Sequence, residues 1–238
     1  MKRFFILSAL LCIIFNLYTR PALADKDTIQ TQAYIGNPQF EAMARKALMD
    51  MPRNFNFTDF RLYYTMTRQY DPIGEATIDA MLKDAYVIQT QADNPEAYKK
   101  ALDDYQLILL NHMAHLGVVL QASALAKTDR RFGDPEFFTW LKAGLIRDLI
   151  LSGNGNSLRE AYDIITLDEE AVLFNYLAMQ PIETLSRREG VVYYNMHTAI
   201  NLKDGVKHTV FVNTSFPMKY LETKTEKEKF YTKPIYKR

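Results

Sequence analysis

The sequence predicts an α+β fold, with helical hairpins first and then a small antiparallel β-sheet with one or two helices. Between residues 38 and 156, apolar side chains recur at three- and four-residue intervals, as they do on one face of a helix. Between residues 157 and 218, alternating runs flank the turn sequences Glu189-Gly190 and Asp204-Gly205, which are typical of β-hairpins. Because helices precede strands instead of alternating with them, we expect an α+β domain over residues 38–218.

Three helices are predicted in the first part of the domain. The first begins at Pro38, which suits a first helical turn because its missing N–H would have no partner there. The second runs from Thr58 to Thr67, with Thr58 as its N-cap. The turn sequence Tyr70-Asp71-Pro72 separates it from the third helix. The third helix is predicted from an apolar face formed by Ile78, Met81, Leu82 and Ala85.

Successive helices with short connections are predicted after residue 93. Asn94-Pro95 and Asp134-Pro135 are start signals, because an Asn or Asp cap is followed by proline at the first helical position. Between them, an apolar stripe runs from Tyr98 to Ile108, and the pattern restarts around Asn111. The arrangement is similar to tetratricopeptide packing, although the sequence shows no 34-residue repeat.

Capping signals and short apolar runs predict the mixed part of the domain, residues 157–218. Ser157 with Glu160, and Thr166 with Glu169, have capping-box spacing and each opens a short helix. The second of these helices ends before Pro181. Four strands are predicted, over Tyr162–Ile165, Ile182–Arg188, Val191–Ala199 and His208–Asn213.

The N-terminal segment, from Met1 to Ala24, has the three parts of a secretory signal peptide. Lys2 and Arg3 supply positive charge, an apolar run extends from Phe4 to Phe15, and Ala22-Leu23-Ala24 offers small residues for cleavage. The apolar run is shorter than the roughly 20 residues that a membrane-spanning helix needs. We therefore expect a cleavable signal and a periplasmic or secreted protein.

Cleavage between Ala24 and Asp25 changes the composition of the chain. It removes Cys12, the only cysteine, and three of the 29 basic side chains but none of the 28 acidic ones, so the net charge becomes about −2. Without a strongly basic domain, we expect no nucleic-acid partner. No cofactor and no transmembrane segment are expected after cleavage, and residues 25–37 are predicted to be a flexible polar segment.

The end of the chain, from Lys219 to Arg238, forms a charged C-terminal tail with seven basic and three acidic side chains. A solvated terminus is the favoured interpretation, and contact with an anionic surface is the alternative.

Four motifs occur in order between residues 54 and 215. They are Phe55-Asn56-Phe57 with Tyr64 and Tyr70-Asp71-Pro72; Ala114-His115; Gly144-Leu145 through Ser152-Gly153-Asn154-Gly155 to Ala161-Tyr162, Glu169-Glu170 and Leu173; and Thr209-Val210-Phe211-Val212. In this order and spacing they resemble the domain-of-unknown-function family 4919, whose members are bacterial exported proteins. The resemblance implies an exported α+β protein and brings no established activity. Asn154 and Ala171 depart from the family pattern, which has an aspartate and an aromatic residue at these positions.

His112 and His115 are the clearest candidates for chemistry. At a spacing of three they would share one helical face and could hold a metal, with Asp103 and Asp104 approaching from a neighbouring helix. A zinc site needs three or four ligands, and the embedded glutamate of zinc proteases is absent. Structural packing of the two histidines is the favoured interpretation, while a ligand or proton-transfer role is the other alternative.

The remaining candidates are a loop, two acidic residues and an aromatic patch. Amides of Gly153-Asn154-Gly155 could hold an anion at a helix start, but glycines that end the preceding helix explain the motif equally well. Glu169 and Glu170 are adjacent and would point in different directions on a helix, which suits a general acid/base pair poorly. The predicted ligand or partner surface consists of Tyr64, Tyr70, Asp71, His112, His115, Asn154 and Glu170.

The helical hairpins and the absence of a catalytic motif favour a non-enzymatic binding or scaffold module of the cell envelope. Its partner would be an envelope protein or another envelope component. The alternative is a metal-assisted or carboxylate-based hydrolase that uses His112 and His115.

Overall fold

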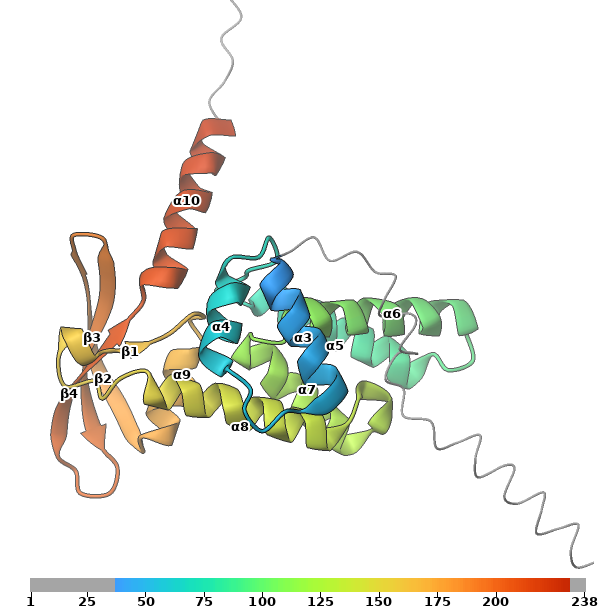
Figure 1. Cartoon of the computed structure of the whole chain (residues 1–238), viewed down its shortest axis with the longest axis horizontal. Coiled ribbons are helices and arrows are strands. Elements are labelled where there is room, and N and C mark those ends of the chain that lie inside the picture. Colours follow the sequence, from blue (N-terminus) through green and yellow to red (C-terminus); the bar gives the residue numbers. More distant parts are fainter. Residues whose placement is uncertain (1–36, 232–238) are drawn as a thin grey trace, which may run out of the picture.

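The computed structural model describes residues 37–231 of the 238-residue chain, and side chains as far as residue 224. The predicted signal peptide and all but the last residue of the predicted flexible segment lie outside this range. Figure 1 shows a body of helices at one end of the molecule and a β-sheet at the other, with α10 projecting beside the sheet. The predicted α+β class, with helices first, is confirmed.

Six helices form the body of the molecule. They are α3 (Pro38–Asp50), α4 (Phe57–Thr65), α5 (Glu75–Thr90), α6 (Pro95–Asn111), α7 (Leu116–Thr128) and α8 (Pro135–Leu151). A 3₁₀ turn, η1 (Arg130–Phe132), joins the last two. The side chains of Asn94 and Asp134 cap α6 and α8 as predicted, by accepting from the N–H groups of Ala97 and Glu136. None of the helices in residues 37–231 is long and apolar enough to cross a membrane.

The cap of α4 differs from the prediction. Asn56, not Thr58, is the N-cap, and its side chain accepts from the N–H of Asp59. The hydroxyl of Thr58 donates instead to Asp148 Oδ1 on α8, at 2.5 Å. The Thr58 hydroxyl therefore bonds to a residue that is distant in the sequence, and does not cap its own helix as the local pattern predicted.

The prediction that His112 and His115 share one helical face is wrong. His112 is the C-cap of α6, and His115 is the N-cap of α7. A turn lies between them, closed by the bond from the His115 N–H to the His112 carbonyl at 2.9 Å. The apolar pattern continued across the break because the residues of this turn, including Met113 and Ala114, are buried.

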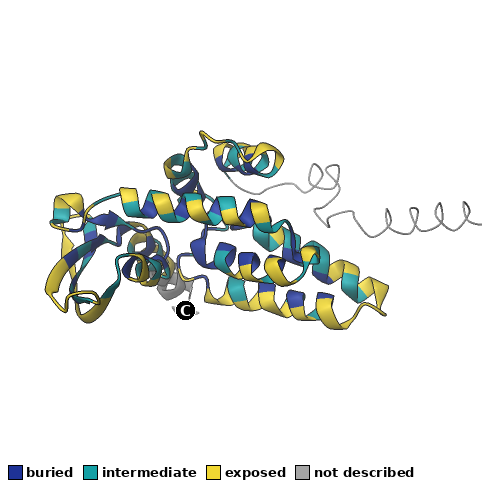
Figure 2. Cartoon of the chain, turned by 90° about the horizontal axis from the view of Figure 1, so that it is seen from below, coloured by how far each residue is buried: buried dark blue, intermediate teal, exposed yellow. Residues whose placement is uncertain are grey.

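The helical core is aromatic where α3, α4 and the following turn meet. Phe40 stacks on Phe60 with a centroid distance of 5.0 Å, and Tyr64 meets the ring of Tyr70 edge-on at 5.4 Å. All four side chains are buried. Figure 2 shows buried residues along the helix faces that point inward and exposed residues on the outer faces. The apolar periodicity of the sequence is thus the inward face of each helix.

The sheet has four strands in the order β1-β4-β3-β2. They are β1 (Tyr162–Asp163), β2 (Met179–Glu189), β3 (Val192–Asn201) and β4 (Lys207–Asn213). The pairs of β3 with β2 and with β4 are antiparallel, as predicted. The short β1 instead pairs with β4 in parallel, so the sheet is mixed. It cannot form a hairpin with β4 because a helix and the strands β2 and β3 lie between the two in the sequence.

Two helices accompany the sheet. Helix α9 (Glu169–Tyr176) precedes β2, and α10 (Ser215–Tyr231) follows β4. Most of α10 occupies the stretch for which the sequence predicted a charged, solvated tail. Its first turns are held by both parts of the domain, because the Tyr220 ring meets Tyr70 at 5.2 Å and Glu222 accepts from the hydroxyl of Tyr193 on β3.

The glycine loop after α8 also differs from the prediction. No left-handed glycine ends α8, because its C-cap is Ser152 in a right-handed conformation. The N–H groups of Asn154 and Gly155 both donate to the carbonyl of Glu160, so these amides are not available to an anion. A Cβ on Gly153 would lie 2.4 Å from that same carbonyl oxygen. The predicted helix after Ser157 is only a 3₁₀ turn, η2 (Leu158–Glu160).

Candidate functional site

Five of the seven predicted site residues come together in the interior of the molecule. Tyr64, Tyr70, Asp71, His112 and His115 lie where α4, the turn before α5, and the α6–α7 junction meet; we call them the Tyr64 cluster. The tyrosines and histidines are buried, and Asp71 is partly buried. The pattern of these residues in the sequence therefore marks part of the core.

A short chain of hydrogen bonds runs through the Tyr64 cluster. The N–H of Asp71 donates to the Tyr64 hydroxyl oxygen at 3.3 Å, and that hydroxyl lies 2.8 Å from Nδ1 of His112. When the neutral imidazole carries its proton on Nε2, the Tyr64 hydroxyl donates to Nδ1. Burial lowers the pKa of His112 to about 4, and the neighbouring His115 acts in the same direction. Burial also raises the pKa of Tyr64 well above its ordinary value. Both groups are therefore neutral at physiological pH.

His115 has no solvent-exposed surface. Its Nδ1 is 3.5 Å from the N–H of Val118, which it caps, and 3.8 Å from Asp168 Oδ2. Its Nε2 faces the backbone of Gly74, where a Cβ would lie only 2.2 Å away. Within residues 37–224, no group of three His, Cys, Asp or Glu side chains is arranged to hold a metal ion. Asp104, a predicted neighbour of the histidines, instead pairs with Lys100 on the exposed side of α6.

Asp71 closes the turn before α5. Its Oδ1 accepts from the N–H groups of Ile73 and Gly74, and its Oδ2 accepts from the Thr77 hydroxyl at 2.7 Å. Burial alone would raise the pKa of this carboxyl, but the bonds from Gly74, Thr77 and Ile73 outweigh burial and lower it. Asp71 is thus a structural carboxylate.

A second buried polar group joins the helical body to the start of the sheet. Arg61 on α4 pairs with Asp148 on α8 at 2.8 Å and with Glu169 on α9 at 2.9 Å. Glu169 Oε2 also accepts from the N–H of Ile165 at 2.7 Å. The predicted capping partner, Thr166, keeps only a long backbone contact of 3.5 Å to this carboxylate. Glu169 thus binds Arg61, whereas the sequence pattern predicted that it would cap a helix.

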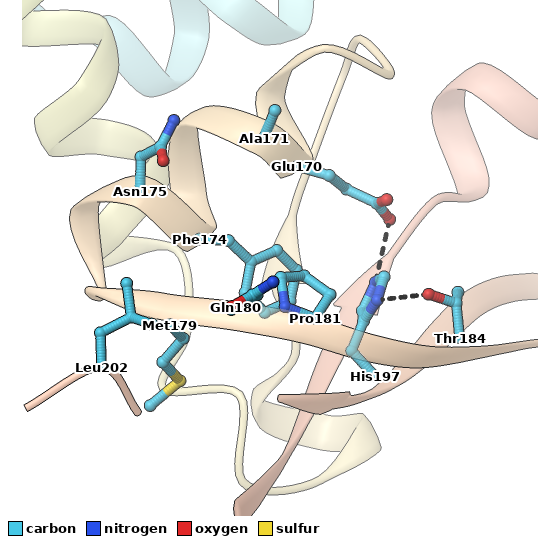
Figure 3. A pocket seen from close by; sticks show the side chains of 10 residues that line it. All are labelled: Glu170, Ala171, Phe174, Asn175, Met179, Gln180, Pro181, Thr184, His197 and Leu202. Carbon is cyan, nitrogen blue, oxygen red and sulfur yellow. Dashed lines mark hydrogen bonds and ion pairs between the residues drawn. The ribbon is translucent and has the colours of Figure 1, made fainter. Parts of the chain in front are cut away.

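The other two predicted residues lie apart from the Tyr64 cluster. Asn154 is exposed, and its Oδ1 accepts from the N–H of Asn156 at 2.9 Å within the loop. Glu170 is on α9 and lines a surface pocket of about 530 Å³. Figure 3 shows this pocket between α9 and the β2–β3 hairpin. The lining residues are Glu170, Ala171, Phe174, Asn175, Met179, Gln180, Pro181, Thr184, His197 and Leu202.

The polar side of the pocket is a short chain of interacting groups. Thr184 on β2 lies opposite His197 on β3, and its hydroxyl is 2.9 Å from Nδ1 of His197. The other ring nitrogen, Nε2, is 3.4 Å from Glu170 Oε1 (Figure 3). Asn195 donates to the same Oε1 at 2.6 Å. The Phe174 ring meets the imidazole edge-on at 4.7 Å, so polar and aromatic contacts together fix the orientation of the imidazole.

These contacts fix which atoms the pocket offers to a ligand. Oε1 of Glu170 can only accept, so Nε2 of a neutral His197 carries the proton and Nδ1 accepts from Thr184. The side chain of Glu170 is 22% exposed, and the contacts described for its carboxylate all use Oε1. The pocket therefore presents acceptor oxygens on one side and the apolar side chains of Met179 and Leu202 on the other (Figure 3).

Sequence reasoning found Glu170 but missed His197 and Thr184. A signal was present: in a strand with a period of two, His197 falls on the same face as Tyr193 and Ala199, both of which are buried. A histidine on the inward face of a strand needs a polar partner. That partner could not be identified from the sequence, because it comes from α9 and from the strand register.

No family model, curated protein or solved structure matches this chain. The resemblance to family 4919 therefore stays a prediction, and the geometry of the site carries the functional argument.

Proposed function

We propose that this protein is an exported binding module, which takes up an extended segment of another envelope protein at the free edge of β2. This keeps the binding function that the sequence favours and gives it a location. The observation that carries the proposal is a long, exposed edge strand that forms one wall of a pocket.

The edge strand has the properties of a docking site. β2 is last in the strand order, and its eleven residues are all exposed except Met179, which is partly exposed. In an antiparallel strand, alternate residues direct N–H and C=O away from the neighbour, so an edge strand can pair with an added strand. Ile182 and Leu185 add apolar surface with exposures of 47% and 37%.

The same strand carries features that limit indiscriminate pairing. A register shift interrupts its ladder with β3 between Pro181 and Glu183, and Arg187 and Arg188 place charge near its end. Natural proteins protect edge strands with such irregularities, prolines and charges. An added strand must therefore gain affinity from more than its backbone, and the neighbouring pocket supplies a place for one of its side chains. Main-chain pairing combined with a side-chain pocket is a known mode of peptide recognition.

The proposal is tested with a random-peptide display library selected on purified residues 25–238. Neighbouring residues Leu185 and Ser186 direct their N–H groups to opposite sides of β2, so Leu185→Pro and Ser186→Pro form a matched pair. One variant should unfold at lower denaturant because it breaks the ladder with β3. The other should keep its stability and lose binding of the selected peptides, and Ser186→Ala should bind normally.

Hydrogen exchange gives the second readout. Selected peptides should slow the exchange of those β2 amides in residues 182–188 that point away from β3, because these exchange quickly in the free protein. Peptides that bind equally well to both proline variants, or a selection that enriches none, would overturn the proposal. A dimer that one of the proline variants dissociates would also overturn it, because the occupant would then be a second copy of the chain.

A further inference from the structure

We infer that the pocket between α9 and β2–β3 takes a cationic side chain, a lysine or an arginine, from the bound segment. The inference rests on the proposed function and names the class of residue that the site recognises. It combines the charge of the pocket lining, the apolar walls and Oε2 of Glu170, for which the described residues supply no hydrogen-bond partner.

The charge of the lining favours a cation. Glu170 is the only Asp, Glu, Lys or Arg among the ten lining residues. Its Oε1 is held by Asn195 and by His197, which orients the carboxylate without supplying a full positive charge when the imidazole is neutral. A carboxylate in this setting gains most from a charged donor, because charge-assisted hydrogen bonds are about twice as strong as neutral ones.

The walls of the pocket suit the aliphatic stem of such a side chain. Met179 and Leu202 lie on the side of the pocket away from Glu170 in Figure 3, and Pro181 lies between them and His197. Lysine and arginine bury their methylene groups along apolar surface while the charged end reaches a polar partner. A volume of about 530 Å³ leaves room for one long side chain.

The position of Thr184 links the pocket to the edge strand. Thr184 belongs to β2, yet its hydroxyl contacts His197 inside the pocket. A segment paired alongside β2 places every second side chain on the face of the sheet that carries Thr184. One of these side chains can turn into the pocket towards Glu170.

The inference is tested with two small probes that need no edge pairing, N-acetyl-lysine methylamide and N-acetyl-norleucine methylamide. They differ by the ammonium group and have similar stems. In NMR titrations of residues 25–238, the lysine amide should shift the side-chain signals of Asn195 and His197 and bind at least tenfold more tightly than the norleucine amide. N-acetyl-arginine methylamide should behave like the lysine amide.

Glu170→Gln should reduce the affinity for the lysine amide at least tenfold, while Glu183→Gln should leave it unchanged. Glu183 is the matched control, because it is an exposed glutamate of β2 outside the pocket. Equal binding of the lysine and norleucine amides, or an equal effect of both substitutions, would overturn the inference.

The two proposals fail separately. Display-selected peptides that protect β2 but lack lysine and arginine would remove the cation preference and leave edge pairing in place. Binding of the lysine amide without any peptide that protects β2 would leave the cation site and remove edge pairing.

Discussion

Arg61 Nη2 lies 2.9 Å from Glu169 Oε2, and this contact joins α4 of the helical body to the first turn of α9, beside the sheet. The Glu169 side chain has no exposed surface, and that of Arg61 has 5%. Burial would lower the pKa of Arg61, but Glu169 and Asp148 outweigh burial and raise it. Burial raises the pKa of the Glu169 carboxyl, although Arg61 and the bond from the Ile165 N–H oppose this rise. The contact is therefore a buried junction between the two parts of the domain.

Replacing one partner of this pair should destabilise the protein strongly. Arg61→Met leaves Glu169 as an unpaired buried acid, and Glu169→Leu leaves part of the Arg61 charge unpaired. Each single change should cost about 3–5 kcal/mol, whereas the double variant should cost less than the sum of the two. Urea denaturation of the three variants measures this coupling. Lys100→Met, which removes an exposed ion pair on α6, is the control and should leave the midpoint unchanged.

Acid should weaken the fold through His112. Its pKa is about 4 in the folded protein and 6.5 ordinarily, so between these values the unfolded chain binds the proton more readily. Stability from this histidine is complete above pH 6.5 and is lost as the pH falls towards 4, by roughly 3 kcal/mol in total.

His112→Asn removes this titration and should flatten the profile of unfolding free energy between pH 7 and 4.5. His208→Asn, at an exposed position of β4, should keep the wild-type slope. An unchanged slope in the His112 variant would show that other groups control the acid sensitivity.

Adding a methyl group at Gly74 should destabilise the fold, because the group would overlap with the His115 ring. Gly74 has a φ of 75°, and a Cβ there would lie 2.2 Å from His115 Nε2. Gly74→Ala should therefore cost about 1–2 kcal/mol for the left-handed backbone and about 1–3 kcal/mol more for the overlap. Gly190, with a φ of 60° and open space around it, separates the two effects. Gly190→Ala should show only the backbone cost, as measured by thermal or urea unfolding.

Export should remove the segment from Met1 to Ala24. When the full chain is expressed in a bacterium with a secretion pathway, mass spectrometry of the mature protein should find Asp25 at the N-terminus. Ala24→Leu should slow cleavage, because the peptidase requires a small residue there. Recovery of the intact chain from the cytosol would contradict the predicted signal peptide.

Local patterns predicted most elements but not their polar partners. Asn94 and Asp134 start helices as expected, since a cap bonds to its own next turn. Thr58 and Glu169 also had cap-like spacing, yet they bind Asp148 and Arg61, which are 90 and 108 residues away in the chain. A side chain at a capping position can equally well bind a distant residue. Only the packing of the fold decides whether it caps its own helix or makes the distant contact.

In the candidate site, too, the sequence predicted local features but not the contacts between distant residues. His112 and His115, which the sequence pattern marked as candidates, form caps and buried contacts. His197, which no sequence pattern marked, lines the pocket. A helix-like run of apolar residues continued through the turn at His112 because buried turn residues are apolar too. Sequence proximity therefore suggested a shared helix face where the chain changes direction.

The sequence by itself determined the helical body, the hairpins of the sheet and the order in which they occur, because periodicity, caps and turns depend on neighbouring residues. The tertiary structure decided the parallel pairing of β1, the partners of Arg61 and the pocket of Glu170, Thr184 and His197. These features join segments that are distant along the chain. They depend on how these distant segments pack together, which no local pattern contains.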